Sequence, residues 1–239
     1  MAHPGPLAPL PAAFAGTSLA LHRLAVYVVS PARRHATGNE IALEPTPGGF
    51  GTPSGAVWGQ VRVDGEELVV RRGDDPERRA PITTLRAAAA FAGIVPDVAA
   101  AEQFDVPAPG DLDEQLAIDG ASVAALAAFY AVSASALALL RDELDDASPV
   151  RLWPEHFDVA IDAGSEARAR RGTWGASPGD AAHPAPYLYV SVWSGAPDDP
   201  FFGETAFPGA SLPYDELVRA PDAGTRALEF WRAANTRLN

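Results

Sequence analysis

The sequence predicts an α+β fold in which a mostly antiparallel sheet carries flanking helices. Three observations support this prediction: a hairpin signal at Asp64-Gly65, alternating strands in the C-terminal half, and helical stripes without a strand–helix–strand rhythm. The chain has 239 residues, 47% of them hydrophobic and 21% charged, as in ordinary globular proteins. We expect a single domain over 14–239, a flexible proline-rich leader over 1–13, and any joint between subdomains near 95–120.

Apolar residues recur at helical spacing in five segments, which are 14–29, 81–94, 122–144, 214–218 and 225–238. We expect Pro31 to end the first helix, because proline lacks the amide that a helix interior needs. In the second helix, Thr83 or Thr84 is the expected N-cap and Gly93 the expected stop. The third helix contains the longest uncharged stretch, and its one-sided pattern favours a buried soluble helix over a membrane span.

Strand signals are short runs in which apolar and polar residues alternate. These runs cover 41–44, 56–63, 66–72, 156–162, 170–174 and 187–194. Because Asp-Gly is the pair that a two-residue type I′ turn prefers, we expect Asp64-Gly65 to connect the second and third strands. In the C-terminal strands, alternation places His156 and Asp158 on one face, and likewise Tyr187 and Tyr189.

The residue types exclude several kinds of chemistry. Cysteine is absent, and all 18 residues counted as Lys+Arg are arginine, so the chain is also free of lysine. A thiol nucleophile, a cysteine-ligated metal, a lysine Schiff base and a P-loop lysine are therefore excluded. The net charge of −13 disfavours nucleic acid and membrane surfaces as partners. We expect a soluble cytoplasmic protein, and the sequence does not indicate its oligomeric state. Segment 48–53 is glycine-rich without a phosphate-loop motif, and we interpret it as a tight bend or lid.

Aromatic and polar residues gather between 153 and 193. Five of the ten Trp and Tyr residues of the chain fall in this region. Amphipathic rings beside carboxylates suit an uncharged polar or sugar-like ligand, so we expect a small-molecule cleft that serves binding or catalysis. The expected ligand-binding residues are Trp174, Tyr187, Tyr189 and Trp193.

The same region offers two catalytic alternatives. For acid–base catalysis, His156, Asp158 and Asp180 would supply an imidazole and carboxylates tuned near neutral pH. For a metal-dependent enzyme, His156, Asp158 and His183 have the composition of a facial triad that binds Fe(II) or another divalent metal. Asp180 is equally an ordinary turn residue that bonds its own backbone, and His183 precedes a proline in a loop.

A third class of function is a protein-interaction module without catalysis. Residues 101–150 carry ten acidic residues against one arginine. The acidic segment 97–119 would present the docking surface of such a module. A cross-linked partner at this segment, combined with a cleft that binds no metabolite, would favour this class.

Several blocks of the sequence resemble a known family. The blocks are LHRLAVYVV, GGFGTP, ITTLRAAAAFAGI, LWPEHFDVAID, GASPGDAAHPAPYLYV and LPYDEL. They resemble an actinobacterial family with no assigned function, and the LWPEHFD and PYLYV blocks also resemble a wider bacterial domain family of unknown function. The resemblance spans nearly the whole chain and implies one domain, but it implies no activity. The wider family has His where this chain has Glu155, which weakens a ligand role for Glu155.

Overall fold

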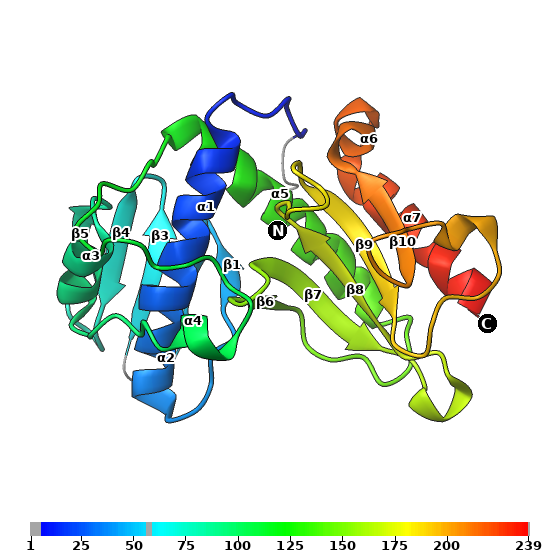
Figure 1. Cartoon of the computed structure of the whole chain (residues 1–239), viewed down its shortest axis with the longest axis horizontal. Helices are drawn as coiled ribbons and strands as arrows, with labels where there is room; N and C mark the ends of the chain where they lie inside the picture. Colours follow the sequence, from blue (N-terminus) through cyan, green and yellow to red (C-terminus); the bar gives the residue numbers. More distant parts are fainter. Residues whose placement is uncertain (1–5, 56–58, 239) are drawn as a thin grey trace. The chain divides into compact units, whose positions relative to one another are not determined.

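The fold class predicted from the sequence is confirmed. The computed structural model describes residues 6–55 and 59–238, and within these ranges the strands form two five-stranded antiparallel sheets with helices packed beside them (Figure 1). The strand orders are β1-β2-β3-β4-β5 and β10-β9-β8-β7-β6.

The chain forms two compact units, each of which is described by itself. The N-terminal unit holds residues 10–127 and 152–157, and the C-terminal unit holds 6–9, 128–151 and 158–238. Segment 95–120 lies wholly within the N-terminal unit, so the chain passes between the units at other points. Of the expected leader, residues 1–5 lie outside the described residues. Leu7 is 6% exposed and the Tyr214 hydroxyl donates to the carbonyl oxygen of Ala8 at 2.8 Å, so this part of the leader is packed.

The N-terminal unit is built on a sheet of short strands. They are β1 (Glu44–Thr46), β2 (Gly49–Gly51), β3 (Gln60–Asp64), β4 (Glu67–Arg71) and β5 (Arg78–Pro81). The predicted hairpin is present, but its turn is shifted by one residue, because Asp64 pairs with Glu67 and the turn is Gly65-Glu66. Gly65 has φ +63° and Glu66 does not have a positive φ, which matches a type II′ turn with glycine first. Residues 56–58 of the expected strand lie outside the described residues.

Two other expectations for this sheet are wrong. The strand expected over 41–44 begins only at Glu44. Segment 48–53 is not a lid, because it contains the buried strand β2, in which Phe50 is fully buried. Gly51 is needed there, since a Cβ on this residue would lie 2.4 Å from the Cβ of Arg62 on the neighbouring strand.

The helices of this unit are α1 (Phe14–Leu24), the π-helical turn η1 (Ala25–Val29), α2 (Ser30–Thr37), α3 (Leu85–Ala92) and α4 (Ala100–Gln103). Contrary to the prediction, Pro31 does not end the first helix, and α1, η1 and α2 form one rod that stops at Gly38, φ +94° (Figure 1). The wider π-helical turn directly before Pro31 relieves the clash that a proline ring makes with the preceding turn. The prediction for α3 is confirmed, since the Thr84 hydroxyl accepts the Ala87 amide at 3.1 Å and Gly93 has φ +73°.

The longest helix, α5 (Gly120–Arg141), runs from one unit into the other. By length and composition alone, α5 is able to cross a membrane. Half of its most apolar stretch is buried inside the protein, and Val123, Leu126 and Leu137 of the predicted stripe are at most 2% exposed. This burial fits the core helix of a soluble protein.

The C-terminal unit combines the second sheet with two helices. Apart from β6 (Arg151–Trp153), of which only Arg151 falls within this unit, its elements are β7 (Asp158–Ala163), η2 (Glu166–Arg168), β8 (Gly172–Ser177), β9 (Tyr187–Val192), η3 (Pro200–Phe202), β10 (Gly209–Pro213), α6 (Tyr214–Arg219) and α7 (Ala223–Leu238). Strand pairing aligns Ile161, Trp174 and Val190 in one row, and all three are at most 1% exposed. The helix α7 packs on this sheet, where the Trp231 indole donates to the carbonyl oxygen of Tyr189 at 3.1 Å (Figure 1). The apolar row is therefore core.

Candidate functional site

The other face of the C-terminal sheet is polar, and we call it the polar face. The strand register places Ala160, Gly175, Tyr189 and Ser211 in one row across β7, β8, β9 and β10. Because side chains alternate along a strand, this face also carries Asp158, Asp162, Thr173, Ser177, Tyr187 and Ser191. Asp158, Tyr187 and Tyr189 lie together on this face.

Tyr189 is fixed on the polar face by one carboxylate and one glycine. Its hydroxyl donates to Oδ2 of Asp158 across the width of β8. Its ring lies over Gly175, where an added Cβ would be 2.4 Å from the ring. Burial, followed by the neighbouring charge of Asp158, raises the pKa of Tyr189 well above its usual value. The phenol therefore keeps its proton and acts as a hydrogen-bond donor.

Tyr187 makes the matching contact with a carboxylate from the loop after β8. Its hydroxyl donates to Oδ2 of Asp180 at 2.5 Å, and the rings of Tyr187 and Tyr189 have centroids 6.0 Å apart. The other oxygen of Asp180 accepts the backbone amides of Ala182 and His183 at 2.8 and 2.7 Å. Burial alone would raise the pKa of Asp180, but these donors outweigh it and lower the pKa, so the carboxylate stays ionised. Asp180 is thus both a turn residue and the acceptor of the Tyr187 hydroxyl.

His183 lies beside Tyr187 and is held by a second carboxylate. The centroids of the two rings are 4.3 Å apart, and Nε2 of His183 lies 3.1 Å from Oε2 of Glu204. The Ser211 hydroxyl donates to the same oxygen of Glu204 at 2.6 Å, and Oε1 accepts the amide of Ala206. Burial opposes ionisation of Glu204, but these donors and the nearby His183 hold its pKa at about 2.

His183 lies between two carboxylates. The Nδ1 atom of His183 is buried, has no hydrogen-bond partner among the described residues, and lies 3.6 Å from Oδ1 of Asp180. The carboxylates have fixed donors, and the Phe207 ring adds an apolar edge, 6.0 Å from Tyr189. The polar face therefore presents hydrogen-bond acceptors and ring faces.

Two of the predicted ligand-binding residues do not belong to this cluster. Trp174 is 1% exposed in the apolar row, so the prediction that it binds ligand is wrong. Trp193 lies just beyond β9, six residues from Tyr187 and hence about 20 Å along an extended chain. It is 54% exposed, and its indole donates to the Thr173 hydroxyl at 3.1 Å while Arg171 covers its ring.

His156 does not stand on a strand with Asp158, contrary to the prediction. The strand β7 begins at Asp158, and His156 is an exposed residue of the preceding turn. Phe157 has φ +54°, and this left-handed residue breaks the alternation on which the prediction rested. In the described part of the chain, no three His, Asp or Glu side chains are grouped so that they could hold a metal ion, which leaves the set His156, Asp158 and His183 without support.

The LWPEHFD block has a structural role within the N-terminal unit, which the sequence did not indicate. Nε2 of His22 lies 3.0 Å from the carbonyl oxygen of Pro154 and 3.1 Å from that of Glu155. The His22 ring also stacks on Phe157, with centroids 5.1 Å apart and an interplanar angle of 10°. The turn 154–157 is thus anchored to α1.

The acidic segment 97–119 is bound to its own unit. Asp97, Asp113 and Glu114 form ion pairs with arginines of α2, α3 and α1. The Tyr27 hydroxyl also donates to the carbonyl oxygen of Pro107 at 2.6 Å. These contacts hold the segment against the helices, so part of its charge is already neutralised by internal partners.

Glu204 and Ser211 were not predicted as site residues. Glu204 follows His183 by 21 positions in an irregular segment, and this spacing matches no local motif. The strand β10, which carries Ser211, had no expected counterpart, so its pairing with β9 gave no signal in the sequence.

In comparisons with known proteins, no protein-family model, no curated protein and no solved structure matches this chain. The resemblance to an actinobacterial family therefore stays a prediction, and the functional argument rests on the site itself.

Proposed function

We propose that the protein binds a small polar molecule on the polar face of its C-terminal sheet, and that this ligand is uncharged and rich in hydroxyl groups, as a sugar is. The observation that carries the proposal is the pair of phenol–carboxylate contacts, Tyr187 with Asp180 and Tyr189 with Asp158, on neighbouring positions of one strand. The cytoplasm is the proposed setting, in line with the absence of cysteine.

The chemistry of the residues supports a ligand that donates hydrogen bonds. Asp180 has a lowered pKa and a side chain that is 44% exposed, so it is anionic at neutral pH and accepts hydrogen bonds from a ligand. Glu204 also has a lowered pKa and adds a second negative charge, but its side chain is only 8% exposed. Ligand hydroxyl groups meet such acceptors well, and the apolar side of a sugar ring packs on tyrosine and phenylalanine rings. An anionic ligand is disfavoured, because these carboxylates repel it.

Calorimetric titration of the full chain with glucose, galactose, ribose and glucose 6-phosphate tests the proposal. We expect at least one neutral sugar to bind and glucose 6-phosphate to bind more weakly than glucose. On addition of the sugar, the backbone amide chemical shifts of Gly175, residues 180–183 and Tyr189 should change. If no neutral sugar binds, or if the phosphorylated sugar binds more tightly, the proposal is wrong.

Tyr187→Phe and Tyr214→Phe form a matched pair of variants. Each removes one phenolic hydroxyl from the C-terminal unit, but the Tyr214 hydroxyl bonds to Ala8 and not to a carboxylate of the polar face. We expect Tyr187→Phe to weaken sugar binding several-fold, because Asp180 loses the phenol that orients its carboxylate, and Tyr214→Phe to leave it unchanged. Equal affinities for the two variants would contradict the assignment of the site.

A further inference from the structure

A separate cavity lies within the N-terminal unit. Its volume is about 290 Å³. Residues of α2, β3, β4 and the end of α3 line it, namely Ala32, His35, Ala36, Val61, Val70, Arg71, Arg72, Ala92 and Ile94. The volume lies just below the range of about 300–1,000 Å³ that is typical of ligand sites, which fits a small ligand.

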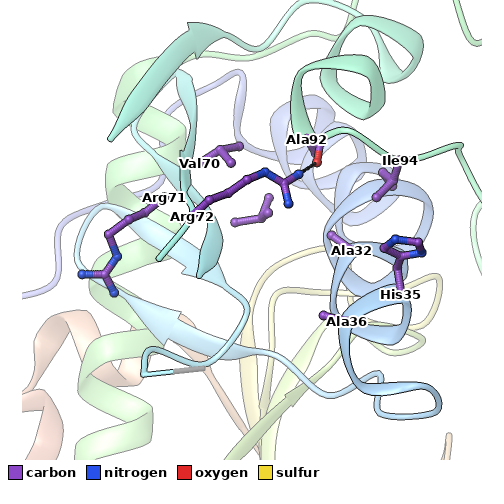
Figure 2. Close-up of a pocket in the computed structure, with 9 residues that line it drawn as sticks. Ala32, His35, Ala36, Val70, Arg71, Arg72, Ala92 and Ile94 are labelled. Carbon is purple, nitrogen blue, oxygen red and sulfur yellow. Dashed lines mark hydrogen bonds between the residues drawn. The ribbon is translucent and has the colours of Figure 1, made fainter. Parts of the chain in front are cut away.

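The cavity combines apolar walls with basic side chains at its edge. Its alanines, valines and Ile94 offer apolar contact, and the lining residues that the structure describes include no acid. Figure 2 shows the Arg72 side chain extending from the end of β4 toward α3, and the His35 ring standing on α2, whereas the Arg71 side chain points away. The chain has a net charge of −13, whereas the edge of this cavity carries the basic side chains of Arg72 and His35.

Arg72 has spare hydrogen-bonding capacity. Its Nη2 donates to the carbonyl oxygen of Ala92 at 2.6 Å, which caps the C-terminal end of α3. A guanidinium has five N–H donors, so the remaining ones are available to a ligand. Within the described residues, neither Arg72 nor His35 forms an ion pair with a carboxylate, in contrast to Arg79 of the neighbouring strand.

We propose that this cavity binds a small monocarboxylate, with its carboxylate on Arg72 and His35 and its apolar body against Val61, Val70 and Ile94. A guanidinium matches the planar geometry of a carboxylate, and the apolar walls require a ligand with a hydrocarbon part. The cavity size limits that part to a short chain or one ring. This site is independent of the polar face, because every lining residue belongs to the N-terminal unit.

Hexanoate and hexanol are the matched probes, and calorimetry with amide shift mapping on the full chain is the assay. We expect hexanoate to bind at least tenfold more tightly than hexanol, because one charge-assisted contact is worth about 1.5–3 kcal/mol. Amides near Val70, Ala92 and Ile94 should shift with hexanoate. If hexanoate does not bind at about 10 mM, a concentration sufficient for fragment-sized ligands, or if hexanol binds equally well, the proposal is wrong.

Variants separate ligand binding from the capping role of Arg72. His35→Gln should weaken hexanoate binding several-fold without changing stability, because His35 is exposed and makes no hydrogen bond within the described residues. Ala36→Leu should block the cavity, and Ala90→Leu is its control, an exposed alanine of α3 outside the lining. Hexanoate binding that survives Ala36→Leu, or that Ala90→Leu abolishes equally, would overturn the proposal.

Discussion

The half-buried imidazole of His22 makes the stability of the N-terminal unit depend on pH. Carbonyl oxygens only accept hydrogen bonds, so Nε2 carries the proton that is shared between Pro154 and Glu155. Burial lowers the pKa of His22 to about 4, and the two carbonyl contacts offset only part of this effect. The folded protein therefore holds His22 neutral at physiological pH.

The sign and size of the effect follow from linkage. In the unfolded chain the pKa of His22 returns to about 6.5, so between that pH and about 4 the unfolded state binds a proton that the folded state does not bind. The stabilisation is fully present above pH 6.5 and is lost as the pH falls toward 4. A difference of roughly 2.5 pKa units corresponds to about 3 kcal/mol, and partial solvent exposure of the ring brings the expected loss nearer 2 kcal/mol.

Urea unfolding of the wild type and of His22→Gln at pH 7 and pH 4 measures this loss. A glutamine places an amide N–H near the position of Nε2 but does not titrate. We expect the free energy of unfolding to fall by about 2 kcal/mol more in the wild type than in the variant. His35→Gln is the control, because it removes an exposed imidazole of α2 that is not among the causes of the His22 shift, and it should preserve the wild-type dependence. Parallel pH curves for the wild type and His22→Gln would refute the reasoning.

Three further predictions address other contacts. Thr84→Ala should lower the free energy of unfolding by about 1 kcal/mol through loss of the α3 cap, whereas Thr83→Ala should change it by less than about 0.5 kcal/mol, as urea titration would show. Leu24→Ala should cost about 2–5 kcal/mol in the same assay, because Leu24 is fully buried. Glu204 has its pKa lowered to about 2, so its stabilisation is present above pH 4.5 and lost as the pH falls through 2. Acid titration of Glu204→Gln by circular dichroism should lack that loss, which solvent screening reduces to about 1–2 kcal/mol, and an unchanged acid midpoint would contradict it.

The strand faces that were predicted correctly rest on short-range pattern. Alternation along β9 was enough to place Tyr187 and Tyr189 on one face, and the same pattern put Leu188 and Val190 in the core. The error at His156 arose because a single left-handed residue, Phe157, interrupts the alternation, and sequence patterns do not report a positive φ at phenylalanine.

The sequence by itself determined the fold class, the capping residues of α3 and the apolar stripes of α1 and α5, because short-range patterns of residue type indicate each of them. The tertiary structure decided the hairpin turn, the passage of the first helix through Pro31, the burial of Trp174, and the pairing of His183 with Glu204. These features depend on which distant segments pack together, and the energy of such contacts does not appear in any local window of the sequence.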